Sequence, residues 1–128
     1  MTKVLLVGVG GFIGSSARYL VGVGSARLWP AVGLQLGTLI VNLAGCLLIG
    51  LLTAYADARA IANPELRSLV LIGVLGGFTT FSTFAYETLE LGRAGGSAVA
   101  TTNVALHVLG CLAAVWLGSA AGRMLTGG

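Results

Sequence analysis

The sequence predicts an all-α membrane protein of four transmembrane helices, and its composition and hydropathy pattern both support this class. Of the 128 residues, 56% are hydrophobic and only 9% are charged, with a mean hydropathy of +0.98. Soluble domains carry about 25% charged residues, and a chain this small has too little interior to hide such an excess of apolar side chains. The apolar residues also separate into four segments, each of about 20 residues, the length that a helix needs to cross the hydrocarbon core.

In lipid only a helix satisfies all of its backbone groups within one segment, so each apolar segment is predicted to be a helix rather than a strand. Together the four helices are expected to form a single transmembrane domain that covers the whole chain, residues 1–128. Their expected bounds are residues 4–23, 32–55, 69–91 and 98–117.

The first segment has two interpretations. Lys3 ahead of an apolar run that ends in Ser15, Ser16 and Ala17 is also the pattern of a cleaved signal peptide. Arg18, however, falls within the last turns of the segment and three more apolar segments follow, which favours a permanent span. The Arg18 side chain would then either extend to the interface or draw anions toward a pore mouth.

Pairs of glycines spaced four positions apart, with three residues between them, recur along the chain. This small-xxx-small spacing lets helix backbones approach closely in lipid, where no hydrophobic drive brings helices together. We therefore expect tight helix packing at these positions, which are Gly10/Gly14, Gly33/Gly37, Gly73/Gly77 and Gly118/Gly122.

The second segment carries Thr38, Asn42 and Cys46 at intervals of four residues, which places them on one helix face. An amide at mid-membrane is costly unless it has a partner. Asn42 therefore either hydrogen-bonds to another helix or donates to a permeating anion, and the pattern leaves both roles open. Cys46 is expected to behave as a small buried hydrophobe.

The third segment contains a polar run, residues 76–84, that simple membrane anchoring does not require. Its paired glycines, Gly76 and Gly77, and its threonines weaken a helix, and backbone carbonyls released there would suit a hard cation such as Na⁺. The hydroxyl groups would otherwise serve as interhelical hydrogen-bonding groups, although their density favours a functional break. They belong to Thr79, Thr80, Ser82 and Thr83.

Three phenylalanines accompany this run at intervals of three residues, Phe78, Phe81 and Phe84, and would lie close to one helical face. A phenylalanine stripe is usually packing, but the electropositive edge of a ring can also face an anion in a pore. Glu87 follows Phe84 by three residues, on the side of the hydroxyls, where it would cap a vestibule or pair with a basic residue.

The fourth segment repeats the spacing of the second with Asn103, His107 and Cys111. A histidine on a membrane helix is commonly a satisfied structural residue. Its position between Asn103 and Cys111 makes a polar track the alternative interpretation.

Other classes of function find little support. The net charge is +3, and the basic residues are scattered along the chain without a Lys/Arg cluster that could bind phosphates. No nucleic-acid partner is therefore expected. With four acidic residues and one histidine, acid–base or zinc chemistry has few candidates, and no enzyme is expected.

Three motifs then occur in order, Gly11–Tyr19, Gly37–Gly45 and Gly73–Thr88. In sequence and spacing they resemble the Fluc family of small bacterial fluoride channels, the CrcB-type proteins, and the resemblance covers essentially the whole chain. It implies a multi-pass protein of the bacterial inner membrane that is selective for fluoride and lowers cytoplasmic fluoride by passive export.

The resemblance also implies an antiparallel, dual-topology homodimer, so that the expected partners are a second copy of the chain, fluoride and the lipid bilayer. A structural Na⁺ that is not transported would lie at the dimer centre, held by backbone carbonyls of Gly76 and Thr79 from both chains. Asn42, Phe81 and Phe84 would belong to the fluoride pore.

The fourth segment departs from the family pattern, which has tyrosine and serines on its polar track. Here Asn103, His107 and Cys111 take these places, so a ladder of hydroxyls is missing, and His107 adds an expected sensitivity to pH. The other expected members of a polar track or vestibule are Thr38, Thr80, Ser82, Thr83, Arg18 and Glu87.

Two membrane alternatives compete with a channel. Small multidrug-resistance transporters are also four-span dual-topology dimers, but they rely on a first-span carboxylate, and the first segment here contains no Asp or Glu. A purely structural subunit would leave the run from Gly76 to Phe84 unexplained.

The positive charges give only a weak orientation signal. Four spans place both termini and the second loop on one side, with four basic residues there and two or three on the other. The positive-inside rule needs a clear bias to fix orientation. The two sets are Lys3, Arg59, Arg67 and Arg123 against Arg27 and Arg93, with Arg18 joining the second set if its side chain extends outward.

We therefore predict that the chain inserts in both orientations. A reporter fused to the C-terminus should be found on both faces of the membrane, in comparable amounts. A reporter confined to one face would contradict dual topology.

Overall fold

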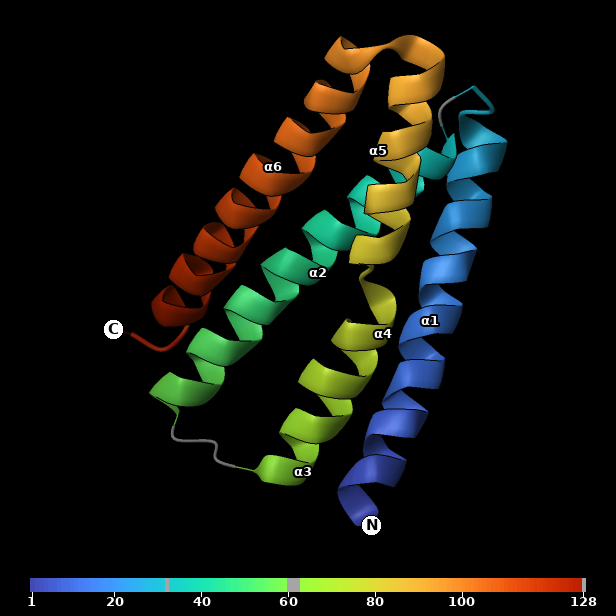
Figure 1. Cartoon of the computed structure of the whole chain (residues 1–128). Coiled ribbons are helices and arrows are strands. Elements are labelled where there is room, and N and C mark those ends of the chain that lie inside the picture. Colours follow the sequence, from blue (N-terminus) through green and yellow to red (C-terminus); the bar gives the residue numbers. More distant parts are fainter. Residues whose placement is uncertain (32, 60–62, 128) are drawn as a thin grey trace.

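The computed structural model describes residues 1–31, 33–59 and 63–127, and in these residues every regular element is helical (Figure 1). Four stretches are long and apolar enough to cross a membrane: Thr2–Leu28, Gln35–Ala58, Pro64–Gly95 and Ser97–Met124. The elements are α1 (Thr2–Leu28), α2 (Gly33–Ala58), α3 (Pro64–Arg67), the π-helical segment η1 (Ser68–Leu75), α4 (Gly76–Phe78), α5 (Phe81–Gly95) and α6 (Ser97–Met124).

The number and order of the predicted helices are confirmed, but each helix extends beyond its predicted bounds, because a helix need not end where the apolar residues end. α1 continues to Leu28 rather than ending near residue 23, and α6 continues to Met124 rather than 117. Arg18 consequently lies ten residues before the end of α1, well inside the helix and not in its last turns as predicted. Residue 32, the predicted start of the second span, lies outside the described residues.

The third span is broken within the predicted run, residues 76–84. Thr79 (φ −90°, ψ 160°) and Thr80 (φ −154°, ψ 120°) are extended, whereas Gly76 and Gly77 are helical. The sequence predicted that the paired glycines and the threonines together weaken the helix, and of these only the threonines unwind it. β-branched residues favour extended backbone, and here two threonines supply the break.

The glycines instead allow α1 to approach the third span. A Cβ added to Gly77 would lie 2.7 Å from the carbonyl oxygen of Gly11, and one added to Gly73 would lie 2.9 Å from the Cα of Gly10. A Cβ on Gly118 would overlap the carbonyl of Leu47 on the α2 side of α6. The close helix packing predicted from the glycine spacing is confirmed at Gly10/Gly14, Gly73/Gly77 and Gly118/Gly122, whereas the surroundings of Gly33 in the fourth pair lie outside what the structure describes.

The break also changes the packing partner of the third span. The first arm, Pro64–Phe78, packs along α1, whereas α5 packs against α6 and α2. Asn63 and Pro64 start the first arm, since the Asn63 side chain accepts hydrogen bonds from the next free amides. Figure 1 shows the resulting arrangement, with the third span beginning beside α1 and ending beside α6.

Gly118→Ala should lower the free energy of unfolding by about 1–3 kcal/mol, since the added methyl group meets helix backbone that cannot rotate away. The matched control is Gly8→Ala on the exposed side of α1, where an added Cβ meets no atom within 4 Å. This control should be neutral or stabilising by up to about 1 kcal/mol through helix propensity. Thermal unfolding of the purified protein in detergent measures both, and equal effects would contradict the packing role.

Candidate functional site

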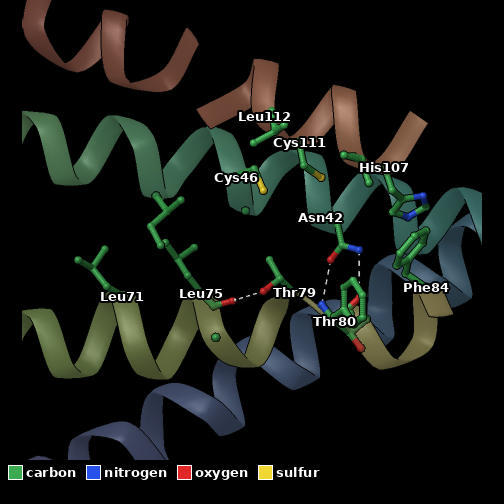
Figure 2. A pocket seen from close by; sticks show the side chains of 15 residues that line it. Asn42, Cys46, Leu71, Leu75, Thr79, Thr80, Phe84, His107, Cys111 and Leu112 are labelled. Atoms are coloured by element: carbon green, nitrogen blue, oxygen red, sulfur yellow. Dashed lines mark hydrogen bonds between the residues drawn. The ribbon is translucent and has the colours of Figure 1, made fainter. Parts of the chain in front are cut away.

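The extended break is held by one side chain, Asn42 of α2. Its Oδ1 accepts a hydrogen bond from the amide of Thr80 at 2.9 Å, and its Nδ2 donates to the carbonyl of Thr80 at 3.0 Å (Figure 2). The Asn42 side chain is buried. Of the two roles left open by the sequence, the structure contains the cross-helix hydrogen bond, and one Nδ2 hydrogen remains to reach another acceptor.

The hydroxyl groups of the break close the two helix ends that meet there. Thr79 Oγ1 donates to the carbonyl of Leu75 at 3.0 Å, at the end of α4. Thr80 caps α5, because its Oγ1 accepts from the amide of Thr83 at 3.2 Å. Thr80 Oγ1 also contacts the hydroxyls of Ser82 at 3.2 Å and Thr83 at 3.0 Å. Three predicted polar residues, Thr80, Ser82 and Thr83, thus form one connected hydroxyl cluster, and the Thr79 hydroxyl bonds separately to Leu75.

A carbonyl-rich helix end and an amide-rich helix end therefore face the same region. In a continuous helix the amide of Thr80 would bond to the carbonyl of Gly76, but it bonds to Asn42 instead. The carbonyl of Thr79 accepts a hydrogen bond from Nη1 of Arg18 at 3.4 Å. The end of α4 favours cations and the start of α5 favours anions.

The predicted pore residues line one cavity of about 480 Å³ beside the break (Figure 2). Side chains from α2, α5 and α6 meet around it. The predicted site residues in its wall are Asn42, Gly76, Thr79, Thr80, Phe81, Phe84, His107 and Cys111.

Most of the remaining wall is apolar and was not predicted. Leucines and glycines that line a cavity have the same sequence pattern as those that pack a helix interface, so no signal distinguishes them. These residues are Gly45, Ile49, Leu71, Leu75, Val108 and Leu112, and Cys46, which the spacing placed on the same helix face as Asn42, completes the wall.

The aromatic residues form a short stack in this cavity. The rings of Phe81 and Phe84 meet edge to face, with centroids 5.3 Å apart and planes at 63°. The ring of Phe84 lies against the imidazole of His107, with centroids 4.4 Å apart and planes at 32°. Phe78 precedes the break and is not part of the cavity wall, so the single face predicted for the three phenylalanines is wrong. The extended residues between Phe78 and Phe81 interrupt the helical period.

A second cavity of about 320 Å³ lies on the α1 side of the break. Thr80 lines both cavities and so separates them. Buried Glu87 accepts a hydrogen bond from Thr38 at 2.7 Å, and within the described part of the chain its Oε2 has no partner. The predicted track or vestibule residues in this wall are Arg18, Thr38, Thr80, Thr83 and Glu87.

The predicted track on α6 is divided. His107 and Cys111 line the first cavity, whereas Asn103 lies outside it and donates from Nδ2 to the hydroxyl of Thr88 at 2.8 Å. Thr88 in turn donates to the carbonyl of Phe84 at 2.7 Å, so Asn103 ties α6 to α5. Sequence reasoning missed Thr88, although its place one turn after Phe84 was available as a signal.

No cluster of three or more histidine, cysteine or acidic side chains in the described residues could hold a metal ion. A cation at the break would therefore depend on carbonyl oxygens such as those of Gly76 and Thr79.

Comparison with known proteins bears on this site. The family model described as CrcB-like protein, Camphor Resistance (CrcB), matches residues 5–119. A protein of Coxiella burnetii (strain CbuK_Q154) is 47% identical over 126 residues, covering 96% of this chain and 99% of that protein. A protein of Caulobacter sp. (strain K31) is 47% identical over 123 residues, covering 92% of each.

A protein of Geotalea daltonii is 40% identical over 127 residues, covering 98% of this chain and all of that protein. All three relatives bear the name fluoride-specific ion channel FluC. The family is thus one of ion channels and not of enzymes. The four apolar helices of this chain make it a multi-pass membrane protein. The resemblance seen in the sequence motifs is confirmed, and the chain belongs to the CrcB-like family of fluoride-specific ion channels.

Proposed function

We propose that this chain is a fluoride-selective channel that lowers cytoplasmic fluoride by letting it leave the cell passively. The names of the relatives support this function. The structural observation that supports this function most directly is the cavity at the broken span, whose wall contains Asn42, Phe81 and Phe84. The cavity holds polar donors and ring edges, and its wall within the described residues contains no carboxylate.

The proposed mechanism is replacement of the hydration shell. Fluoride is small and strongly hydrated, so it enters a narrow path only where compact donors take the place of water. Asn42 supplies an amide N–H, the hydroxyl cluster around Thr80 supplies O–H groups, and the edges of Phe81 and Phe84 carry partial positive charge. Larger halides would be rejected by size.

The two cavities suggest how an ion reaches these donors. Arg18 in the second cavity would attract anions, and Thr80 stands between that cavity and the first. The path we propose runs from Arg18 past the hydroxyls of Thr80 and Thr83 to Asn42 and the phenylalanines. Thr38 and Glu87, which hydrogen-bond to each other, also line the second cavity.

We further propose that two copies associate as an antiparallel homodimer. Phe81 is 78% exposed in the single chain, an unusual position for a ring that would bind an ion. A second copy would cover it. The weak charge bias between the two faces supports insertion of the copies in opposite orientations.

A structural Na⁺ fits the chemistry of the carbonyls at the break. Hard cations take oxygen ligands, and the Gly76 carbonyl lacks its helical partner from Thr80. One chain offers too few oxygens, whereas two chains would contribute Gly76 and Thr79 twice. Arg18 and the cation would compete for the carbonyl of Thr79, so Na⁺ would favour an Arg18 side chain that is free to meet anions.

Liposomes that contain the purified protein should release fluoride rapidly and chloride negligibly. Asn42→Ala and Phe81→Ile should each reduce fluoride efflux by roughly tenfold or more, since each removes a group that replaces water. Leu20→Ala is the control, because Leu20 is exposed on α1 and lines none of the cavities described above. It should leave efflux unchanged.

Two outcomes would reject a fluoride-selective channel. A wild-type protein without fluoride efflux would leave a purely structural role. Equal fluoride and chloride efflux would remove selectivity, and with it the hydration mechanism.

Replacing Na⁺ by a large organic cation such as N-methyl-D-glucamine should weaken the dimer. We expect a lower thermal unfolding temperature and a shift of mass toward the single chain, measured by light scattering after size-exclusion chromatography. Returning Na⁺ should restore both. A dimer whose stability is independent of Na⁺ would contradict the cation site and leave the fluoride function untouched.

A further inference from the structure

His107 is a polar side chain in the first cavity for which the function above provides no role. It is 4% exposed, and its ring lies against Phe84 in the cavity wall. Within the described residues its Nε2 is buried and has no hydrogen-bond partner. A buried polar atom without a partner is rare and calls for an explanation.

The hydrogen bond on the other ring nitrogen determines which proton the ring carries. His107 Nδ1 lies 3.0 Å from the carbonyl oxygen of Asn103, one turn earlier on α6. A carbonyl oxygen only accepts, so Nδ1 must be the donor and carry the hydrogen. In a neutral imidazole Nε2 then holds a lone pair, and this lone pair is the unpartnered atom.

A lone pair cannot hydrogen-bond to fluoride, because fluoride is itself only an acceptor. Neutral His107 therefore offers no donor at the point where its ring meets Phe84. The other neutral tautomer carries its hydrogen on Nε2. In that tautomer the lone pair of Nδ1 would face the oxygen of the Asn103 carbonyl, and the hydrogen bond between them would be lost. Protonation provides the N–H without this loss, because both nitrogens of the imidazolium are donors.

Resting on the proposed function, we propose that His107 is the fluoride-binding group of α6 and that it binds fluoride only when Nε2 is protonated. The binding step adds one proton to Nε2 and places one fluoride beside the new N–H, so no net charge is brought into the cavity. A charge-assisted hydrogen bond of this kind is stronger than a neutral one.

The surroundings can hold an imidazolium. The ring of Phe84, with its centroid 4.4 Å from that of His107, offers its face to a cation. α6 packs only on α2 and α5 among the described elements. Cys46 of α2 and Cys111 of α6 line the same cavity as His107, and Glu87 lies on α5 three residues after Phe84, whose ring contacts His107. Glu87 is the one of the three that must be separated from His107 experimentally.

Fluoride efflux from liposomes should rise about tenfold as the pH falls from about 8 to about 5.5, the range in which histidine side chains titrate. Protein-free liposomes at each pH correct for hydrogen fluoride that crosses lipid directly. His107→Gln carries a neutral amide whose donors do not depend on pH, so its efflux should be flat. Glu87→Gln should keep the slope of the wild-type profile.

A second measurement does not depend on flux or on any variant. His107 is the only histidine of the chain, so ¹⁵N-imidazole labelling gives signals from this residue alone. The signals should show a proton on Nδ1 at high pH. Adding fluoride at fixed pH should increase the protonated fraction of His107. If fluoride binds only the protonated ring, then fluoride binding must in turn favour proton binding. Chloride is the matched control and should cause no increase.

The possible results separate this proposal from the channel itself. Efflux that is present but independent of pH, with a His107 signal that fluoride does not change, overturns the role of His107 and leaves the channel intact. A slope that survives His107→Gln and disappears in Glu87→Gln also overturns it. Absence of fluoride efflux at every pH rejects the channel, and the His107 proposal then falls with it.

Discussion

The pair of hydrogen bonds between Asn42 and Thr80 is the interaction on which the rest of the structure depends. An extended residue within a span leaves an amide and a carbonyl that lipid cannot satisfy, and each would cost several kcal/mol. Asn42 satisfies both groups at once, because its amide has a donor and an acceptor side by side. Without this side chain, the amide and the carbonyl of Thr80 would lose their hydrogen-bond partner.

The consequences of the break reach both sides of the molecule. The first arm of the third span stays with α1, where Gly73 and Gly77 permit close approach, and α5 is released to pack on α6. Two cavities open at the junction, and Thr80 lines both. One buried amide therefore sets the backbone conformation, the choice of packing partners and the position of the groups that we propose bind ions.

The sequence was sufficient for features that depend on composition and spacing, and insufficient for those that depend on neighbours. Hydropathy predicts the four helices, and the glycine spacing predicts where they touch. The break lies inside the predicted run, but the sequence did not show which residues of the run unwind. Gly76 and Gly77 look like helix breakers in isolation, yet both are helical, and Gly77 packs against Gly11 of α1. Asn103 was grouped with His107 by spacing, but Thr88 on α5 engages its side chain instead.

The same reasoning explains why a histidine is not a simple replacement for a hydroxyl on α6. A hydroxyl that bonds to a carbonyl one turn back can rotate, and its hydrogen can turn toward an incoming anion. The imidazole ring of His107 has no such freedom, because its Nδ1 is directed at Asn103 and its face is packed on Phe84. Its capacity to donate into the cavity can change only by gaining a proton. The contact has a further effect on Phe84, since a ring whose face is covered by imidazole has its electropositive edge left to meet an anion. In this chain the departure from a hydroxyl ladder therefore ties the donor on α6 to protonation and at the same time fixes the orientation of the neighbouring ring.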